Sequence, residues 1–351
     1  MSSEKLRLSL EGAFRFLKGN RNPDGLWSDF LTLAGESVYW VTGYVGYAAS
    51  RYRAPGEEEW LGEVARRVLE HQGGDGGWGY GPGVPSDADS TAWCVLFLSR
   101  LGIQGQESRE RALRFLSRHQ STLDGGFRTY AAPRDVGRYM MLDGSVSFDG
   151  WSSSQTCVTG AAARALIESA SPEGLDAALD YIRRCQTPEG YWNSYWWSDR
   201  LYATVNCMEA VRARGDAGDA GLLSRGEDWI ARTQLSGGGW SDSPTREGAA
   251  FSTALAMTGL MVSPGSGFSE RIGRGAEWLL TGQLSDGSWS ANHILRIPHP
   301  SMTEPWKQPH WNRDGRAINA VIRDHRRLFT TATVFTALSE LEERARGDEG
   351  R

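Results

Sequence analysis

The sequence is poor in cysteine, in net positive charge and in long apolar runs, and each scarcity excludes a class of protein. No Cys-x-x-Cys pair occurs, which argues against a disulfide framework or a metal cluster. We therefore expect four free, buried thiols, at Cys94, Cys157, Cys185 and Cys207. Lysine and arginine number 38 against 43 acidic residues, so no nucleic-acid partner is indicated.

No stretch has the uninterrupted apolar length of a membrane span, and the first residues lack the apolar run of a secretory signal. We therefore expect a cytoplasmic protein without a transmembrane segment, while peripheral contact with a membrane surface stays open. With 23% charged and 40% hydrophobic residues, the chain is typical of globular proteins that bury a large core.

What the chain does contain is a repeat. A glutamine, three residues, a glycine, one residue and a tryptophan occur at residues 72–78, 186–192, 234–240 and 283–289. Looser copies occupy residues 21–27, with arginine first, and 120–127, with phenylalanine last. Successive repeat aromatics are 48 to 65 positions apart, which is long enough for two helices and their turns.

Each repeat reads as one amphipathic, charged helix followed by one helix of small and apolar residues. The charged helices are predicted at residues 8–20, 57–72, 107–120, 171–186, 222–234 and 269–283. The apolar helices, expected to be buried on nearly all sides, are predicted at residues 36–52, 87–101, 152–169, 199–214, 246–262 and 324–341. Six outer and six inner helices in alternation predict an all-α fold, a closed double-ring α6/α6 barrel.

One barrel is expected to span residues 1–345, followed by a charged tail at 346–351. Two insertions interrupt the period, at residues 128–151 and 290–323. Both follow a turn that leads into an inner helix, so we expect them to form a lid at one mouth of the barrel. The repeated glutamine and tryptophan are interpreted as structural, with the amide satisfying backbone groups at helix ends and the indole joining neighbouring repeats.

Two carboxylates open one inner helix at the same mouth, in the run Asp87-Ala88-Asp89-Ser90-Thr91. A single aspartate there would be interpreted as a helix cap. Two carboxyl groups this close do not both ionise easily, so one can retain a proton near neutral pH. The helix N-terminus favours the anion that remains after that proton is donated.

The repeats and the acid run together resemble the squalene and terpene cyclases. Residues 225–240 and 274–289 both read Arg-Gly-x-x-Trp-(Leu/Ile)-x-x-x-Gln-x-x-x-Gly-x-Trp, which is similar to that family's repeat motif in full. Residues 317–329 resemble its closing segment. Nearly the whole chain is covered as one barrel, whereas squalene cyclases pair two. The acid run resembles the family's protonating motif, with Ser90 where many members have a third acid.

The resemblance implies a class II terpene cyclase, in which Asp89 donates a proton to a linear isoprenoid substrate and Asp87 supports it. The cation that follows needs a dry cavity with aromatic walls. Inner-helix and mouth aromatics are the candidates for these walls, each of them also a candidate for ordinary core: Tyr39, Trp40, Trp93, Trp151, Trp196, Trp197, Tyr202, Phe251, Trp306, Trp311 and Phe329. No cofactor is expected, except Mg²⁺ if the substrate carries a diphosphate. A homodimer that covers the mouth would replace the missing second barrel.

Two other functions stay open from the sequence. The glycine-rich turn at residues 77–83 superficially resembles that of prenyltransferase β subunits, but these need a zinc held by Asp-x-Cys and histidine, and no Asp-x-Cys occurs. We predict no metal site, although His293, His299 and His310 share one insertion. A non-catalytic toroid that binds a lipid or a protein is the other alternative. The orientation of the two acids distinguishes it from an enzyme, because a proton donor must face an apolar cavity.

Overall fold

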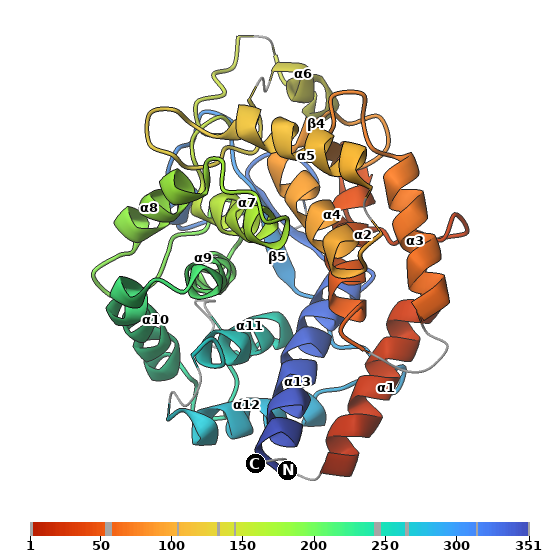
Figure 1. Cartoon of the computed structure of the whole chain (residues 1–351), viewed down its shortest axis with the longest axis vertical. Helices are drawn as coiled ribbons and strands as arrows, with labels where there is room; N and C mark the ends of the chain where they lie inside the picture. Colours follow the sequence, from red (N-terminus) through yellow and green to blue (C-terminus); the bar gives the residue numbers. More distant parts are fainter. Residues whose placement is uncertain are drawn as a thin grey trace.

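The computed structural model describes residues 3–52, 58–103, 105–131, 134–143, 145–241, 247–263, 267–313 and 315–349. Its centre is a closed ring in which each helix packs on the next and the last packs on the first (Figure 1). In ring order the inner helices are α2 (Tyr39–Ala49), α4 (Ala88–Arg100), α7 (Thr156–Glu168), α9 (Leu201–Arg214), α11 (Ala250–Leu260) and α13 (Leu328–Glu349).

A second ring surrounds the first. It consists of α1 (Ser3–Gly19), α3 (Glu58–Glu70), α5 (Gln106–His119), α8 (Leu175–Cys185), α10 (Ala220–Arg232) and α12 (Ser269–Thr281). Burial follows composition: every residue of α11 is buried, whereas in α5 only Ala112, Phe115, Leu116 and His119 are. The predicted all-α double ring is confirmed, since a helix with one apolar stripe can only cover the core and a helix that is apolar all round must lie within it.

The repeat glutamines join neighbouring outer helices. Gln72 Nε2 donates to the carbonyl of Gly76 in its own turn at 2.8 Å and to that of Ser108 at the start of the next outer helix at 2.9 Å. Gln120, Gln186, Gln234 and Gln283 each repeat this double contact. The carbonyls of the turns are thereby satisfied, as predicted, while those at the start of the next outer helix gain a second bond, as at Gly174, which also accepts the N–H of Ala178.

The repeat tryptophans join each outer helix to the following inner helix. Each indole N–H donates to a helix carbonyl ten positions earlier, as from Trp240 to Ile230 at 2.8 Å. The backbone N–H of the repeat aromatic is accepted by a threonine hydroxyl of the inner helix. These hydroxyls belong to Thr42, Thr91, Thr159, Thr204, Thr253 and Thr331. Thr91, which follows the acid pair, therefore has a structural partner.

The glycine of each repeat has a positive φ, for example 96° at Gly76 and 90° at Gly287. A Cβ at Gly287 would stand 2.3 Å from the carbonyl oxygen of Gly12 in α1. Only glycine combines this backbone conformation with so close an approach between the last repeat and the first helix. The turn therefore helps to close the ring.

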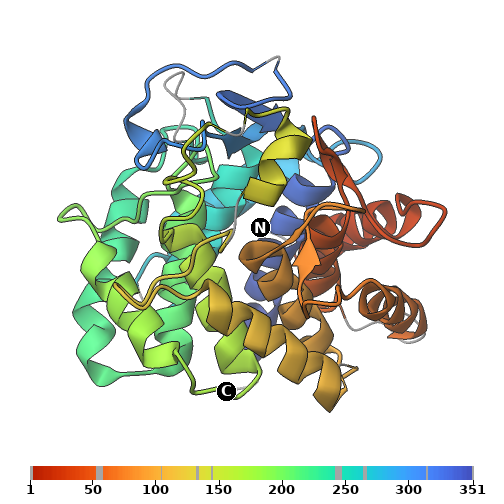
Figure 2. The same cartoon turned by 90° about the horizontal axis from the view of Figure 1, so that it is seen from above.

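Three short antiparallel hairpins, which the sequence pattern did not predict, lie at one end of the barrel. They pair β1 (Asp29–Thr32) with β2 (Gly35–Ser37), β3 (Trp78–Gly79) with β4 (Ser86–Asp87), and β5 (His293–Ile297) with β6 (Ala320–Arg323). The short helices are α6 (Arg134–Gly137), η1 (Arg138–Met140), η2 (Ala217–Asp219) and η3 (Pro305–Lys307). In Figure 2, α6 in yellow and the blue segments around β5 lie on the same edge of the molecule.

Several predicted boundaries were wrong. Residue 36 belongs to strand β2, and α2 begins only at Tyr39. Helix α13 continues beyond the predicted end at 341 to Glu349, so most of the expected charged tail is helical, while residues 350–351 lie outside the described part. All four cysteines are free, but Cys185 is only partly buried.

Candidate functional site

A narrow cavity with about 80 Å³ of free interior lies between the inner ring and the two insertions, within a hollow of about 680 Å³ that includes its open mouth. Its wall is mostly apolar. The lining residues are Thr32, Ala34, Trp40, Tyr80, Val84, Asp87, Asp89, Ser90, Thr129, Tyr130, Val136, Met140, Trp151, Trp196, Leu295 and Ile297. Both predicted acids thus border one apolar space.

Asp87 is held at the N-terminus of α4. Strand β4, which pairs Asp87 with Trp78, leads the chain into the helix, and Asp87 is its N-cap. The carboxylate accepts the backbone N–H of Ser90 at 2.8 Å and the Ser90 hydroxyl at 2.6 Å. Burial raises the pKa of Asp87 to about 7, and the two bonds from Ser90 limit the rise.

Asp89 lies in the first turn of the same helix and is 9% exposed. Its Oδ1 atom is buried and, among the described residues, accepts no hydrogen bond. Burial first, and then the charge of Asp87, raise the pKa of Asp89 well above the usual range of a carboxyl, which favours its protonated form. A protonated carboxyl that borders an apolar cavity and has an oxygen without a partner in the described chain can donate a proton to a very weak base.

Trp40 in α2 is the polar neighbour of Asp89. Its indole N–H acts to lower the pKa of Asp89, although its geometry falls short of a normal hydrogen bond and Nε1 has no other partner in the described chain. The indole is therefore placed to stabilise a carboxylate at Asp89 once the proton has left.

An aromatic cluster packs behind Trp40. The Trp40 ring centroid lies 5.0 Å from that of Phe329 and 5.7 Å from that of Trp197. Trp197 in turn stacks on Tyr202 at 3.9 Å and on Phe251 at 5.2 Å. The structure therefore brings five of the predicted aromatics together, with Trp40 as the one that borders the cavity.

Trp93 extends this cluster away from the cavity. Its indole N–H donates to the Tyr202 hydroxyl at 2.9 Å, and its ring meets Tyr44 edge-on at 4.6 Å. Tyr44 stacks on Phe329 at 3.8 Å. The interior of the barrel is thus filled with aromatic rings on one side of the acid pair.

Trp151 and Trp196 form the opposite wall, with their rings 5.6 Å apart. The Trp196 indole N–H lies 2.7 Å from both Thr129 Oγ1 and Gln155 Oε1, and the Thr129 hydroxyl also donates to Gln155 at 2.6 Å. Trp151 donates its indole N–H to the carbonyl of Pro298 in the other insertion at 3.1 Å. These bonds fix the orientation of both rings.

Three predicted aromatics lie elsewhere. Tyr39 stacks on His71, 4.9 Å away, on the outside of the cavity. Trp306 and Trp311 line a separate, more polar cavity, where Arg296 stands 5.1 Å from the Trp311 ring. Strand β5 divides the two cavities, because alternate side chains point to opposite faces: Leu295 and Ile297 line the first cavity, and Ile294 and Arg296 the second.

Most lining residues that sequence reasoning missed come from loops, short strands and short helices outside the two rings: Thr32, Ala34, Tyr80, Val84, Thr129, Tyr130, Val136, Met140, Leu295 and Ile297. The two insertions in the sequence could have pointed to these lining residues, since they contribute six of the ten. Burial, then the carboxyls of Asp87 and Asp89 and the hydroxyl of Tyr80, raise the pKa of Tyr130 well above the usual range, so Tyr130 stays neutral beside the acid pair.

The two insertions contact one another at the mouth. Gly150 and Trp151 both donate their backbone N–H groups to the carbonyl of Pro300, at 2.7 and 3.2 Å. Tyr195 joins the same region through its hydroxyl, which donates to the Met302 carbonyl at 2.8 Å. Segments about 150 positions apart therefore meet beside the cavity.

In the part of the chain that the structure describes, no three His, Cys, Asp or Glu side chains are grouped so that they could hold a metal ion. His293 Nε2 lies 3.0 Å from the backbone carbonyl oxygen of Arg313, which accepts its N–H, and His299 Nδ1 lies 2.7 Å from the hydroxyl oxygen of Ser301. No described helix is both long and apolar enough to cross a bilayer.

Comparison with known proteins matches two family models along the chain. Residues 7–131 match the prenyltransferase alpha-alpha toroid domain, and residues 157–302 match the squalene-hopene cyclase C-terminal domain. Among curated relatives, the drimenyl diphosphate synthase of Streptomyces showdoensis is 26% identical over 75% of this chain and 46% of its own length. The terpentedienyl-diphosphate synthase of Kitasatospora griseola is 26% identical over 50% of this chain and 33% of its own. The chain thus spans less than half the length of these relatives.

Among solved structures, the type II terpene cyclase MstE from Scytonema matches along nearly its whole length. In complex with its substrate, geranylgeranyl dihydroxybenzoate, it has a TM-score of 0.87 and 30% identity, covering 97% of this chain and 98% of that one. The same enzyme in complex with its product, merosterolic acid A, has a TM-score of 0.88 and 31% identity. The similarity therefore extends over the barrel and both insertions.

Proposed function

The chain belongs to the type II terpene cyclase family, and we propose that it is itself a protonation-initiated cyclase that converts a linear isoprenoid into a cyclic terpenoid. The observation that carries the proposal is Asp89, a buried carboxyl with a raised pKa, whose Oδ1 has no partner in the described chain and which borders an apolar cavity. An exposed helix cap would have neither property.

In the proposed reaction Asp89 protonates the terminal alkene of the substrate. A C–H bond forms at the less substituted carbon, the positive charge appears on the more substituted carbon, and Asp89 becomes a carboxylate. The next alkene attacks the cation and closes a ring. The reaction ends when a proton leaves the last cation or when water adds to it.

Asp87 and Trp40 adjust the strength of this acid in opposite directions. The charge of Asp87 raises the pKa of Asp89 and keeps the proton in place until a substrate arrives. The indole N–H of Trp40 favours the carboxylate that remains. Ser90 binds Asp87 through both its N–H and its hydroxyl, so the supporting carboxylate cannot rotate away.

The walls of the cavity suit the cation. Trp40, Trp151 and Trp196 present indole rings, whose negative faces stabilise positive charge. The lining contains no Lys or Arg among the described residues. We propose that the hydrocarbon part of the substrate occupies this space and that any charged headgroup lies outside it, with Mg²⁺ needed only for a diphosphate.

We further propose that residues 128–151 and 290–323 act as a lid. Their mutual bonds through Pro298 and Pro300 support this role, because a cavity closed from water protects a carbocation from early capture. Two further proposals concern the same mouth. A second copy of the chain covers it in a homodimer, or it contacts a membrane surface peripherally.

The test is product analysis by mass spectrometry. The purified protein, its Asp89→Asn variant and an Asp324→Asn control are incubated with farnesyl and geranylgeranyl diphosphates, their alcohols, squalene and a geranylgeranylated dihydroxybenzoate. We expect a cyclic isomer from the wild type and the control, and a loss of about a thousand-fold in turnover for Asp89→Asn. Binding without turnover by the wild type would favour the non-catalytic toroid, and an active Asp89→Asn variant would remove Asp89 from the mechanism.

A further inference from the structure

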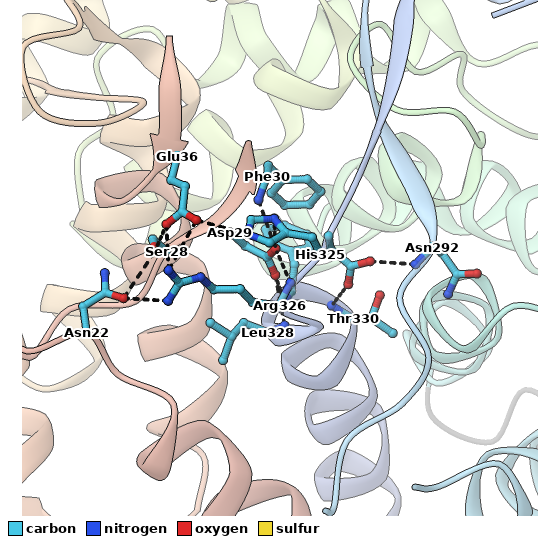
Figure 3. Close-up of polar contacts among 12 residues, drawn as sticks. Asn22, Ser28, Asp29, Phe30, Glu36, Asn292, His325, Arg326, Leu328 and Thr330 are labelled. Atoms are coloured by element: carbon cyan, nitrogen blue, oxygen red, sulfur yellow. Dashed lines mark hydrogen bonds and ion pairs between the residues drawn. The ribbon is translucent and has the colours of Figure 1, made fainter. Parts of the chain in front are cut away.

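A second pair of buried carboxyl groups, Asp29 and Asp324, lies at the seam where the first and last repeats meet. Figure 3 shows Asp29 beside His325, Arg326 and Leu328. Both side chains are fully buried. Asp324 accepts the backbone N–H groups of Asn292 at 2.7 Å and Thr330 at 3.0 Å. It therefore caps α13 from the segment that leads into this helix, and neither of these backbone donors belongs to the aromatic cluster.

Asp29 has a different set of donors. Its Oδ1 accepts the backbone N–H groups of Phe30 at 3.0 Å and Arg326 at 2.9 Å, and its Oδ2 accepts those of Leu328 at 3.0 Å and Phe329 at 3.4 Å. His325 Nδ1 stands 3.4 Å from Oδ1. Both oxygens are thus occupied by backbone donors from the two ends of the chain.

Two of these donors carry rings of the aromatic cluster. Phe30 packs edge-on against Phe329, with centroids 5.2 Å apart, and lies 5.4 Å from Trp40. Phe329 lies 5.0 Å from Trp40. One carboxylate therefore holds the backbone of both phenylalanines that support Trp40, the residue whose indole faces Asp89.

The backbone at Phe30 needs such support. Its φ is 52°, a left-handed conformation that is unfavourable for a bulky residue and persists only where the surroundings enforce it. The bond from Phe30 N–H to Asp29 and the pairing of β1 with β2 fix this residue. Without them the Phe30 ring would leave its place against Trp40.

We propose that Asp29 is a positioning residue of the candidate site, which holds Phe30 and Phe329 against Trp40 so that the aromatic wall keeps its shape while the cation forms. The inference rests on the proposed cyclase function. Asparagine is a poor substitute, because only one of its atoms accepts hydrogen bonds and its NH₂ group would face two backbone N–H donors. Burial raises the pKa of Asp29, while the N–H donors and His325 oppose this rise and favour the anion.

The experiment compares Asp29→Asn with Asp324→Asn, a control at the same seam whose side chain is equally buried and accepts two backbone N–H groups, neither of them from a phenylalanine of the cluster. On the substrate that the wild type cyclises, Asp29→Asn should raise the ratio of incompletely cyclised to fully cyclised product by about ten-fold, while Asp324→Asn leaves the ratio unchanged. Crystal structures of both variants should show the two phenylalanine rings displaced from Trp40 in Asp29→Asn alone.

Failure of the inference can be told apart from failure of the function. If the wild type forms no cyclic product, the proposed function fails. The inference fails independently if the rings of Phe30 and Phe329 keep their positions against Trp40 in the crystal structure of Asp29→Asn. If Asp29→Asn does not fold, Phe30→Gly removes one ring and tolerates the positive φ. An unchanged product ratio in that variant would also overturn the proposal.

Discussion

Two hydrogen bonds from Ser90 act to lower the pKa of Asp87, whereas the charge of Asp87 acts to raise the pKa of Asp89. The asymmetry has a structural cause, because Ser90 gives Asp87 two hydrogen bonds whereas Asp89 Oδ1 has none in the described chain. Asp87 therefore ionises first, and its charge then holds the proton on Asp89. The hydrogen bonds of one serine therefore give the two neighbouring carboxyl groups different roles.

Replacing Asp87 by asparagine should make Asp89 lose its proton at lower pH. The variant removes the negative charge that raises the pKa of Asp89, so the alkaline limb of the pH profile of kcat/KM moves to lower pH. The measurement is the initial rate of product formation from acid to alkaline pH. A limb that stays in place or moves upward would contradict the proposed pairing.

Replacing Trp40 by phenylalanine should have the opposite effect. The ring is kept but the indole N–H, which lowers the pKa of Asp89, is lost, so the alkaline limb moves to higher pH. Turnover should fall by about ten-fold, because the carboxylate left after proton transfer is less stabilised. Trp196→Phe is the matched control, since its N–H bonds Thr129 and Gln155 instead and the limb should not move.

The stability of the protein should decline as pH rises from about 4 to about 8, partly because of Asp324. Burial, and then the charge of Asp29, raise the pKa of Asp324 to about 8 from an ordinary value of 3.8. In this range the folded chain keeps a proton that the unfolded chain releases, so rising pH favours unfolding. Asp324→Asn should make the plot of thermal midpoint against pH shallower. An unchanged slope would contradict a raised pKa of Asp324 in the folded chain.

The glutamine that joins the last repeat to the first should contribute to stability alone. Gln283→Leu removes bonds to the carbonyls of Gly287 and Ser9 and should lower the free energy of unfolding by about 1 to 3 kcal/mol. Gln106→Ala, which loses only an exposed bond to Glu110, should change it by about 0.5 kcal/mol or less. Urea titration measures both, and a changed product ratio in Gln283→Leu would mean that the repeat also shapes the cavity.

Much of the fold could be predicted because its signals are local. The contrast between α11, buried at every position, and the amphipathic α5 is visible in their composition. The hairpins were missed because strands of two to five residues have too little alternation to detect, and because β5 pairs with β6 across a long insertion. For the same reason the sequence pattern did not show that Trp306 and Trp311 line a different cavity from Asp89.

The sequence by itself determined the alternation of inner and outer helices, the glutamine and tryptophan contacts, and the place of the acid pair at a helix start, because helical period and glycine turns act over a few residues. The tertiary structure decided which aromatic rings border the acid, and that Asp29 accepts the N–H of Leu328 from 299 positions away. Such contacts depend on how the ring closes and on the paths of its loops. No local pattern encodes these.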